Sequence, residues 1–419
     1  MTGRRWIIGV LALLPLLILV LLAGGMLLLR QGGSAPYRVP AAKASPMETQ
    51  PGQLEQGAYL ARIGNCAGCH SERGLPPFSG GRAFRSEFGT LYSSNLTPDP
   101  RTGIGDWSLE EFRHAMRHGV SRSGVLYPAF PFANFSLIND ADLDALFAYL
   151  RSLPPQVREP MPARLQFPAS WRTALIGWRM LYYRPLQRVV GSGQSEVWQR
   201  GRYLVDGLGH CAMCHSARGP LESLPMEGYL GGGAITGLGW YAPPLDSASL
   251  QRYSTDELAD YLRFGTSPHG SAYGPMAAVV YNSLRHLTVD DAMAMATFLK
   301  TVPPTIPQQR PASEHGVTGV ASEEGAQLYQ HHCADCHGDE GRGKAGRYPP
   351  LRDSVSIRAP DPVNAVRMIL YGAMPATTAG NPRPYSMPPF VQRLSSTEVA
   401  ELTNYIRSRW GERSPQLTA

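Results

Sequence analysis

Cysteine is the residue type whose spacing in this sequence most clearly specifies chemistry. All 6 cysteines fall into three Cys-x-x-Cys pairs, and a histidine follows each pair directly, giving Cys66, Cys69 and His70; Cys211, Cys214 and His215; and Cys333, Cys336 and His337. Two thiols one helical turn apart can each form a thioether with a vinyl group of one haem, and the next imidazole can then bind the iron. The three motifs therefore predict three covalently bound haem c groups.

Two other kinds of site also use Cys-x-x-Cys. It forms half of many structural zinc sites, and it forms the dithiol of thioredoxin-type redox proteins. A zinc site needs two half-sites and three is an odd number, while a dithiol does not require the histidine. Structural zinc stays the alternative, and the repeated histidine favours haem.

A low-spin electron-transfer haem needs a sixth iron ligand, most often methionine, which raises the reduction potential. Met387 lies in Met387-Pro-Pro-Phe390, shortly before the last predicted helix, and Met276 follows Tyr273-Gly-Pro275. We predict these two methionines as ligands of the third and second irons. The alternatives are Met374 for the third iron, and Met293 and Met295 for the second, whose helical spacing is typical of core residues.

The first motif lacks such a methionine. Phe130 stands where the methionine would lie, and none occurs between Met116 and Met161. His114 and His118 could reach the first iron, although we expect a core or surface role for both. The sequence therefore predicts an unusual or missing sixth ligand at the first haem.

The elements that position these residues recur three times along the chain. A glycine followed three residues later by leucine precedes each motif, at Gly57, Gly201 and Gly325. Capped amphipathic helices are predicted after each motif, over 108–119 and 139–150, over 254–265 and 288–299, and over 361–372 and 395–406. Because glycine has no Cβ, we expect the first helix of each repeat to cross the last one closely, against Tyr149, Phe298 and Tyr405 respectively.

The predicted fold is mainly α, with three tandem cytochrome c domains after an N-terminal transmembrane helix. The predicted boundaries are 1–50 for the anchor and linker, 51–155 for the first domain, 156–194 for an aromatic linker, 195–305 for the second domain, 306–320 for a linker and 321–413 for the third domain. We expect three modest cores, since 419 residues suit about three domains. The first linker, which contains Trp171, Trp178, Tyr182 and Tyr183, is expected to lie on the domains or on a partner subunit.

The N-terminus carries an uncharged apolar stretch from Trp6 to Leu29 after Arg4 and Arg5. It is long enough to span a bilayer and longer than the apolar region of a cleaved signal peptide, so we expect a retained anchor rather than cleavage. The two arginines favour a cytoplasmic N-terminus. The haem domains are then expected in the periplasm, on a single span in the bacterial inner membrane.

The formal net charge of +6 does not by itself identify a partner. The sequence contains no Lys/Arg block or basic helix, and haem propionates would cancel much of the positive charge. We therefore expect a mixed, solvated surface and no nucleic-acid partner.

Several longer motifs carry a resemblance to a known family, at residues 88–98, 102–105, 126–131, 209–215 and 348–351. With them the chain resembles the tri-haem cytochrome c subunit of bacterial membrane-bound dehydrogenases of the alcohol, gluconate, fructose and sorbitol type, which is related to subunits of molybdenum aldehyde and N-heterocycle dehydrogenases. The resemblance implies a separate catalytic subunit, of flavin, quinoprotein or molybdenum type. It also implies that the haems relay electrons from that subunit to ubiquinone or a terminal oxidase.

The chain departs from the family pattern in two places. The family has a methionine just before the last helix of the first domain, where this chain has Leu137 and Ile138, and many members anchor through a C-terminal amphipathic segment, whereas Gly411 to Ala419 is polar. No dinucleotide loop or nucleophile–base pair is evident, so we expect an electron-transfer subunit rather than the catalytic one. The alternatives are an autonomous haem enzyme with an open first haem and a free anchored carrier that feeds an oxidase.

Overall fold

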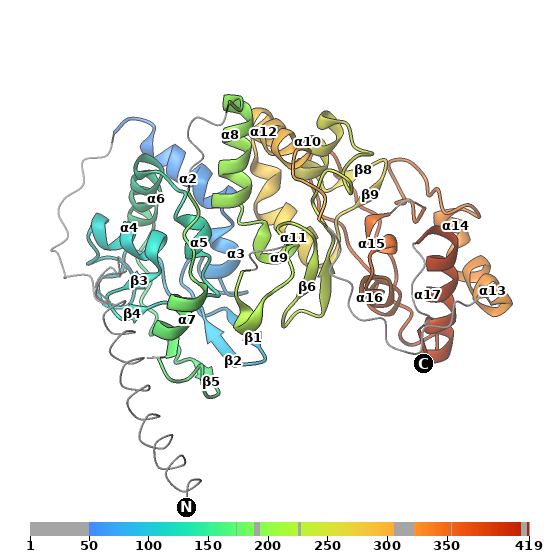
Figure 1. The fold of residues 1–419 in the computed structure, drawn as a ribbon, viewed down its shortest axis with the longest axis horizontal. Coiled ribbons are helices and arrows are strands. Elements are labelled where there is room, and N and C mark those ends of the chain that lie inside the picture. The colour runs from blue at the N-terminus through green and yellow to red at the C-terminus, as the bar shows by residue number, and fades with distance from the viewer. Residues whose placement is uncertain are drawn as a thin grey trace, which may run out of the picture.

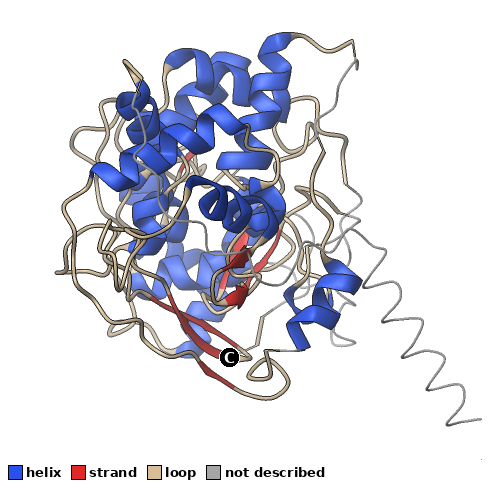
Figure 2. Ribbon diagram, turned by 90° about the vertical axis from the view of Figure 1, so that its left-hand side faces the viewer, coloured by secondary structure: helices blue, strands red, loops and turns tan. Residues whose placement is uncertain are grey.

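The computed structural model describes residues 50–172, 174–187, 193–224, 228–305, 322–352, 354–411 and 417–418. Helices dominate this part of the chain, and the strands are few and short (Figure 2). The predicted fold class is thus confirmed as mainly helical. The predicted span over 6–29 lies outside the described residues, and none of the helices within them is long and apolar enough to cross a membrane.

Three units follow one another along the long axis of the molecule, and each has a first helix, a short motif helix, a middle helix and a last helix in the same order (Figure 1). Unit 1 contains α2 (Gln53–Ile63), α3 (Cys66–His70), α4 (Leu109–His118), α5 (Phe132–Phe135) and α6 (Asp140–Ser152). Unit 2 contains α8 (Glu196–Arg202), the π-helix η1 (Tyr203–Leu208), α9 (Ala212–His215), the 3-10 helices η2 (Pro220–Glu222) and η3 (Leu284–His286), α10 (Thr255–Phe264), α11 (Gly274–Asn282) and α12 (Val289–Leu299). Unit 3 contains α13 (Glu323–His332), α14 (Ala334–His337), α15 (Val355–Arg358), α16 (Val363–Tyr371) and α17 (Ser396–Trp410).

Short antiparallel strands complete the first two units. In unit 1, β1 (Ala83–Ser86) pairs with β2 (Gly89–Tyr92), and β3 (Val120–Ser121) pairs with β4 (Gly124–Val125). In unit 2, β6 (Gly233–Ile235) pairs with β7 (Trp240–Ala242), and β8 (Thr266–Ser267) pairs with β9 (Gly270–Ser271). Both units therefore have a two-stranded hairpin directly after the middle helix.

The six helices predicted after the motifs are all present, and their ends follow from local side chains. The Ser108, Ser254 and Ser395 hydroxyls accept from the third backbone N–H of α4, α10 and α17 and complete capping boxes. Asn139 and Thr288 cap α6 and α12 in the same way. Gly119 and Gly265 end α4 and α10 at φ of 61° and 71°, a conformation that glycine adopts without strain.

The first and last helices of each unit cross at the predicted glycine. A Cβ on Gly57 would lie 1.9 Å from the Ala145 carbonyl oxygen, and one on Gly201 would lie 1.9 Å from that of Ala294. A Cβ on Gly325 would lie 2.6 Å from the carbonyl oxygen of Glu401. The Cβ atoms of the predicted aromatic partners Tyr149, Phe298 and Tyr405 lie within 3 Å of these positions. The predicted close crossing is confirmed in all three units.

The expectation of three separate cores is wrong. Buried apolar residues of units 1 and 2 form one continuous cluster, which Ala376 of unit 3 joins, whereas the helices of unit 3 pack around a second cluster. The Leu208 side chain approaches Gly64 across the boundary of the first two units, and Leu137 approaches Gly207. Two hydrogen bonds cross the same boundary, from Ser283 to the Ile63 carbonyl and from the Asn134 amide to the Asp206 carbonyl, both at 2.7 Å. Units 1 and 2 therefore pack as one body.

A reciprocal pair of tyrosine–aspartate contacts holds this body together. Tyr59 on α2 donates to Asp291 on α12, and Tyr203 donates to Asp142 on α6, both at 2.5 Å. Each tyrosine hydroxyl also lies 3.4 Å from the backbone N–H of the residue that caps the same partner helix. Burial, and then the Asp291 hydrogen bond, raises the pKa of Tyr59 to about 12, so that it stays a donor. Each unit thus completes the start of the other unit's last helix.

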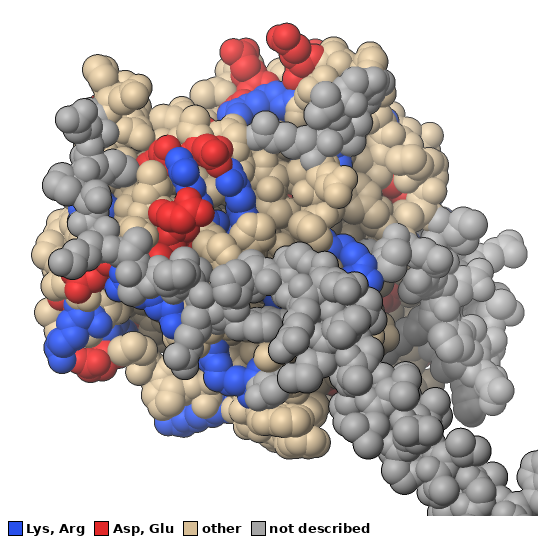
Figure 3. Space-filling model, turned by 60° about the vertical axis from the view of Figure 1, so that its left-hand side comes forward, with Lys and Arg blue, Asp and Glu red and all other residues tan. Residues whose placement is uncertain are grey.

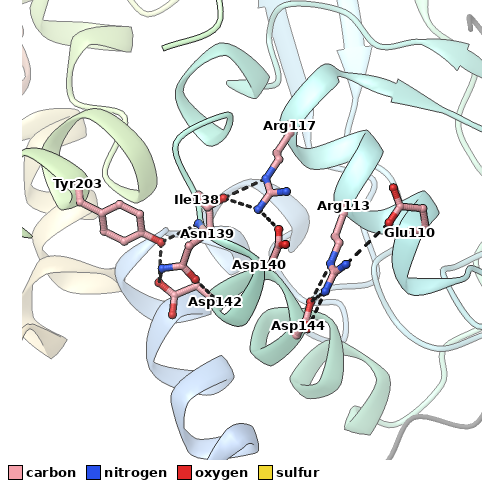
Figure 4. A network of polar contacts seen from close by, with 9 residues as sticks. All are labelled: Glu110, Arg113, Arg117, Ile138, Asn139, Asp140, Asp142, Asp144 and Tyr203. Carbon is pink, nitrogen blue, oxygen red and sulfur yellow. Dashed lines mark hydrogen bonds and ion pairs between the residues drawn. The ribbon is translucent and has the colours of Figure 1, made fainter. Parts of the chain in front are cut away.

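A polar network surrounds the start of α6 (Figure 4). Arg113 on α4 forms a double hydrogen bond with Asp144, and Arg117 donates to the Ile138 carbonyl and pairs with Asp140. Tyr203 reaches the same region from unit 2. The network ties the middle helix, the last helix and the neighbouring unit to one another.

The aromatic linker after unit 1 lies on both units. Its strand β5 (Arg164–Leu165) joins the β1–β2 sheet, and its helix α7 (Ala174–Tyr182) follows. Trp178 donates to the Leu221 carbonyl of unit 2, and the Tyr183 hydroxyl donates to the Arg117 carbonyl of unit 1. The linker is therefore a packed strap over the domains, as expected, although the Trp171 side chain remains exposed.

Acidic and basic side chains lie next to one another on the face of the molecule in Figure 3 rather than in separate regions. This agrees with the expected mixed surface.

Candidate haem-binding sites

The three motif histidines have the same hydrogen bond. The Nδ1 atoms of His70, His215 and His337 lie 2.8, 2.7 and 2.9 Å from the backbone carbonyl oxygens of Ser94, Pro243 and Pro349. A carbonyl only accepts, so each Nδ1 carries the proton and each Nε2 keeps its lone pair. Burial lowers the pKa of all three imidazoles and keeps them neutral, against the opposing effect of that hydrogen bond. Each histidine is thus fixed as a ligand for a metal through Nε2.

The loop after each histidine also has the same geometry three times. The histidine carbonyl accepts from the backbone N–H of Gly80, Gly232 and Gly343 in units 1, 2 and 3. Two residues before each of these glycines, the backbone again adopts a positive φ, of 62° at Phe78, 53° at Leu230 and 64° at Gly341. The backbone carbonyl of this positive-φ residue accepts from the backbone N–H of a leucine, which lies two residues after the carbonyl partner of the histidine. The leucine is Leu96 in unit 1, Leu245 in unit 2 and Leu351 in unit 3. Three loops of different length therefore converge on one arrangement around the imidazole.

The two cysteines of each motif lie within one short helical turn of its histidine. Burial, and then the charge of neighbouring groups, raises the pKa of Cys66, Cys211 and Cys333 to about 12. A structural zinc site needs four such ligands gathered around one ion. Within the described residues, no three His, Cys, Asp or Glu side chains gather as ligands of one metal ion.

The first two motifs lie close to each other. The Cys214 sulfur is near enough to Cys69 to raise the pKa of that thiol, which burial raises more. On the other side of unit 2, the Asn364 side chain of α16 hydrogen-bonds both backbone groups of Tyr241, at 2.9 and 2.7 Å. Tyr241 stands two residues before Pro243, the carbonyl partner of His215. Unit 3 therefore contacts the segment that orients the second histidine.

The predicted methionine ligands and the alternative methionines differ in how far they are buried. Met276 and Met387 are partly buried, and each packs against the core of its own unit. Met387 is held in place by a pair of backbone hydrogen bonds with Ala373. Met374 is 66% exposed, and Met295 is buried within the core on α12. Met293, on the same helix, packs against that core as expected.

Unit 1 has no methionine in the corresponding place. His114 and His118 face each other on α4 with ring centroids 4.9 Å apart, and the His118 side chain is exposed. The helical period places this pair opposite Phe112 and Met116, which face the core. His118 is thus exposed, whereas His114 is half-buried and its Nδ1 lies 3.2 Å from the Val120 carbonyl oxygen.

Sequence reasoning missed the carbonyl partners of the histidines and the positive-φ loop. A signal for both is present, because the segments Ser94-Asn-Leu96, Pro243-Pro-Leu245 and Pro349-Pro-Leu351 each place a leucine two residues after the accepting carbonyl. The histidine and its carbonyl acceptor are 24, 28 and 12 residues apart in the three units. Because this separation varies, the repeat is not evident from the sequence.

The residues of all three sites fit a covalently attached haem. Each offers two cysteine side chains for thioether bonds and one imidazole whose Nδ1 is hydrogen-bonded, which leaves Nε2 for the iron. The hydrogen bond on Nδ1 would orient the ring and raise its strength as a ligand.

Comparison with known proteins identifies the family. The cytochrome c family model matches residues 322–410. The gluconate 2-dehydrogenase cytochrome c subunit of Pantoea cypripedii is 36% identical over 85% of this chain and 86% of its own length. The cytochrome c subunit of the quinone alcohol dehydrogenase of Gluconobacter oxydans is 33% identical over 86% of this chain and 79% of its own length. A di-haem c-type cytochrome of Cereibacter sphaeroides is 35% identical over 68% of this chain and 98% of its own length. The chain therefore belongs to the family of cytochrome c subunits that includes those of gluconate and alcohol dehydrogenases.

Proposed function

We propose that the chain is a tri-haem electron-transfer subunit of a dehydrogenase complex. The observation that carries the proposal is the threefold repetition of one site, with the same imidazole hydrogen bond, the same loop and the same glycine crossing. Units 1, 2 and 3 are then three cytochrome c domains. The names of the relatives support a catalytic dehydrogenase subunit as partner.

Each haem would supply one-electron chemistry through its iron. The protein supplies the covalent attachment through the cysteine pairs and a neutral, oriented imidazole on one side of the iron. Met276 and Met387 would each offer a thioether sulfur, to the haems of the second and third motifs respectively, and a thioether ligand raises the reduction potential of a haem.

The packing of the units supports a continuous route for electrons. The Cys214 thiol lies close enough to Cys69 to act on it electrostatically, and Cys66 and Cys211 both pack against the shared core of units 1 and 2, so the first two haems would be near neighbours. Asn364 and Arg367 of unit 3 contact Tyr241 and Trp240, beside the second site. The name of the di-haem relative agrees with two haem sites in one body.

The remaining parts of the proposal concern location and acceptor. Residues 6–29 would anchor the chain in the bacterial inner membrane, with the haem domains in the periplasm. A catalytic subunit of flavin, quinoprotein or molybdenum type would deliver electrons, and ubiquinone or a terminal oxidase would receive them. Substrate selection would belong to the catalytic subunit.

A haem count tests the central claim. Denatured, fully matured protein in a pyridine haemochrome assay should contain about three thioether-linked haems per chain. Cys214→Ala should leave the second haem weakly held, whereas the first and third stay attached. A count of two or fewer in wild-type protein would contradict the proposal, and the identity of a copurifying subunit would name the electron donor.

A further inference from the structure

The hairpin after the middle helix provides an internal comparison between units 1 and 2. In unit 1 it runs from Gly119 to Phe130, and in unit 2 it runs from Gly265 to Met276, with the same number of residues. Both segments begin at a glycine in the left-handed region and both contain a two-residue antiparallel pair. The two segments can therefore be compared position by position.

Backbone hydrogen bonds confirm that the two segments match. The N–H of Leu126 donates to the Gly119 carbonyl at 2.8 Å, and the N–H of Ala272 donates to the Gly265 carbonyl at 2.7 Å. At the far end, the N–H of Phe130 donates to the Tyr127 carbonyl at 3.0 Å, and that of Met276 donates to the Tyr273 carbonyl at 3.1 Å. Phe130 thus occupies in unit 1 the backbone position that Met276 occupies in unit 2.

The two side chains also share an environment but not a chemistry. Both are partly buried and pack against the common core of units 1 and 2. The Phe130 ring meets the edge of Phe135 at a centroid distance of 5.3 Å. A thioether sulfur has a lone pair that can bind iron, whereas a phenyl ring has none.

Other side chains of unit 1 do not replace the missing sulfur. Met116 lies three residues before the glycine that ends its helix. The same position is occupied by Leu262 in unit 2 and by Ile369 in unit 3, so it is a position for an aliphatic core residue. His114 and His118 lie on the opposite face of α4. Met161 is 41% exposed on the strap.

One partly buried histidine outside the motifs, His210, lies nearby and belongs to unit 2. The His210 ring packs against Phe135 at a centroid distance of 5.7 Å, so Phe135 contacts both His210 and Phe130. In unit 3, His332 also directly precedes a motif cysteine and contacts a phenylalanine, Phe390, at a centroid distance of 5.6 Å, although with a steeper angle between the rings and a more exposed imidazole. The contact of His210 therefore matches a packing role that recurs beside a methionine-bearing site.

We propose that Phe130 leaves the haem attached to Cys66 and Cys69 without a sixth protein ligand, and that this haem alone binds small neutral diatomic ligands such as carbon monoxide. The inference rests on the proposed function only in requiring a haem at this motif. It adds a ligand-binding site that electron transfer does not need.

The wild-type test uses the full-length, detergent-purified protein with its haem content measured first. Titration of the reduced protein with carbon monoxide should saturate at one ligand per chain. In the oxidised protein, the near-infrared band of methionine-ligated iron should have an intensity equivalent to two haems, and a high-spin signal should account for the third.

Reciprocal variants provide the matched control. Phe130→Met should abolish carbon monoxide binding and raise the near-infrared band to three equivalents. Met276→Phe should do the reverse, with two carbon monoxide molecules per chain and one equivalent of the band. Because the two variants exchange side chains between matching backbone positions, either one that folds is sufficient for the test.

The contrary results are distinct from a failure of the proposed function. Wild-type protein with three haems that binds no carbon monoxide would overturn the inference, whether its band equals three methionine-ligated haems or its spectrum shows two nitrogen ligands on one iron. The second spectrum would point to His210. Fewer than three haems per chain would instead contradict the proposed function itself.

Discussion

Adding one methyl group at Gly57 or Gly201 should separate two helices that now touch. In Gly201→Ala, the new Cβ would lie 1.9 Å from the Ala294 carbonyl oxygen and 2.9 Å from the Phe298 Cβ, whereas Cβ contacts under 3.0 Å are essentially never observed. The obstacle is backbone, which cannot rotate away as a side chain can. The α8–α12 pair must therefore open by about 1 Å, and the reciprocal contacts with unit 1 must open with it.

The expected cost follows from this displacement. Overpacking a well-packed core costs typically about 1–3 kcal/mol, and a collision with backbone on this scale belongs at the upper end, about 3 kcal/mol. For a body of about 250 residues this corresponds to a fall in Tm of roughly 6–12 °C. Gly325→Ala meets its oxygen at 2.6 Å and should cost less, about 1–2 kcal/mol.

Scanning calorimetry of the haem-loaded protein measures these effects. Units 1 and 2 share a core and should unfold in one transition, whereas unit 3 has its own core and should unfold in another. Gly57→Ala and Gly201→Ala should lower the first transition, and Gly325→Ala only the second. Gly177→Ala on α7 is the control, because nothing lies within 4 Å of its new Cβ, and it should be neutral or stabilising by up to about 1 kcal/mol.

Two outcomes would refute this reasoning. If Gly201→Ala and Gly177→Ala have the same stability, then the helix crossing does not depend on the missing Cβ. If Gly325→Ala lowers the transition of units 1 and 2, then the division of the protein into a shared body and a separate third unit is wrong.

Two further predictions concern charge and potential. Burial raises the pKa of Asp291, but hydrogen bonds from Arg200 and Tyr59 lower it more, so the folded-state pKa lies below the ordinary value of 3.8. The contribution of ionised Asp291 to the free energy of unfolding is therefore complete above pH 3.8 and is lost as the pH falls through the folded-state pKa. The difference in unfolding free energy between wild type and Asp291→Asn should accordingly shrink during acid titration. A difference that stays constant with pH would contradict the assignment. In a spectroscopic redox titration, Met276→Gln should lower the reduction potential of one haem and Met387→Gln that of another, because an amide oxygen stabilises the reduced iron less than a thioether does. If both variants shift the same haem, then one of the two methionines is not a ligand.

Local signals made much of this fold predictable. The capping residues Ser108, Ser254 and Ser395 mark helix starts within four residues of sequence, and the glycine crossings follow from a spacing repeated three times. The histidine and cysteine sites follow from the motif alone. Local sequence can predict such features because the interacting groups belong to one turn or one repeat.

The features that sequence did not predict depend on contacts between distant segments. Tyr59 and Asp291 are 232 residues apart, and nothing near either residue indicates the other. Phe78 and Leu230 adopt positive φ although neither is a residue type that favours it, because the loop must return to the histidine carbonyl. The segment from Gly201 to Cys211 is one residue longer than the matching segment from Gly57 to Cys66. The π-helix at Tyr203–Leu208 accommodates this extra residue. Register shifts of this kind obscure the alignment of the repeats.

The shared body of units 1 and 2 has a consequence for biogenesis. Protein chains are made from the N-terminus, so α2 and α6 exist before their partners Asp291 and Tyr203 have been synthesised. Until then, part of the apolar surface of unit 1 is not packed against unit 2, and the start of α6 lacks its hydrogen bond from Tyr203. If the three motifs carry haem as proposed, the first two sites would therefore reach their final closed form together, after residue 299, whereas the third site would mature by itself. A substitution that disrupts the second site is then expected to leave the first site incompletely folded. A substitution that disrupts the third site is not expected to do so.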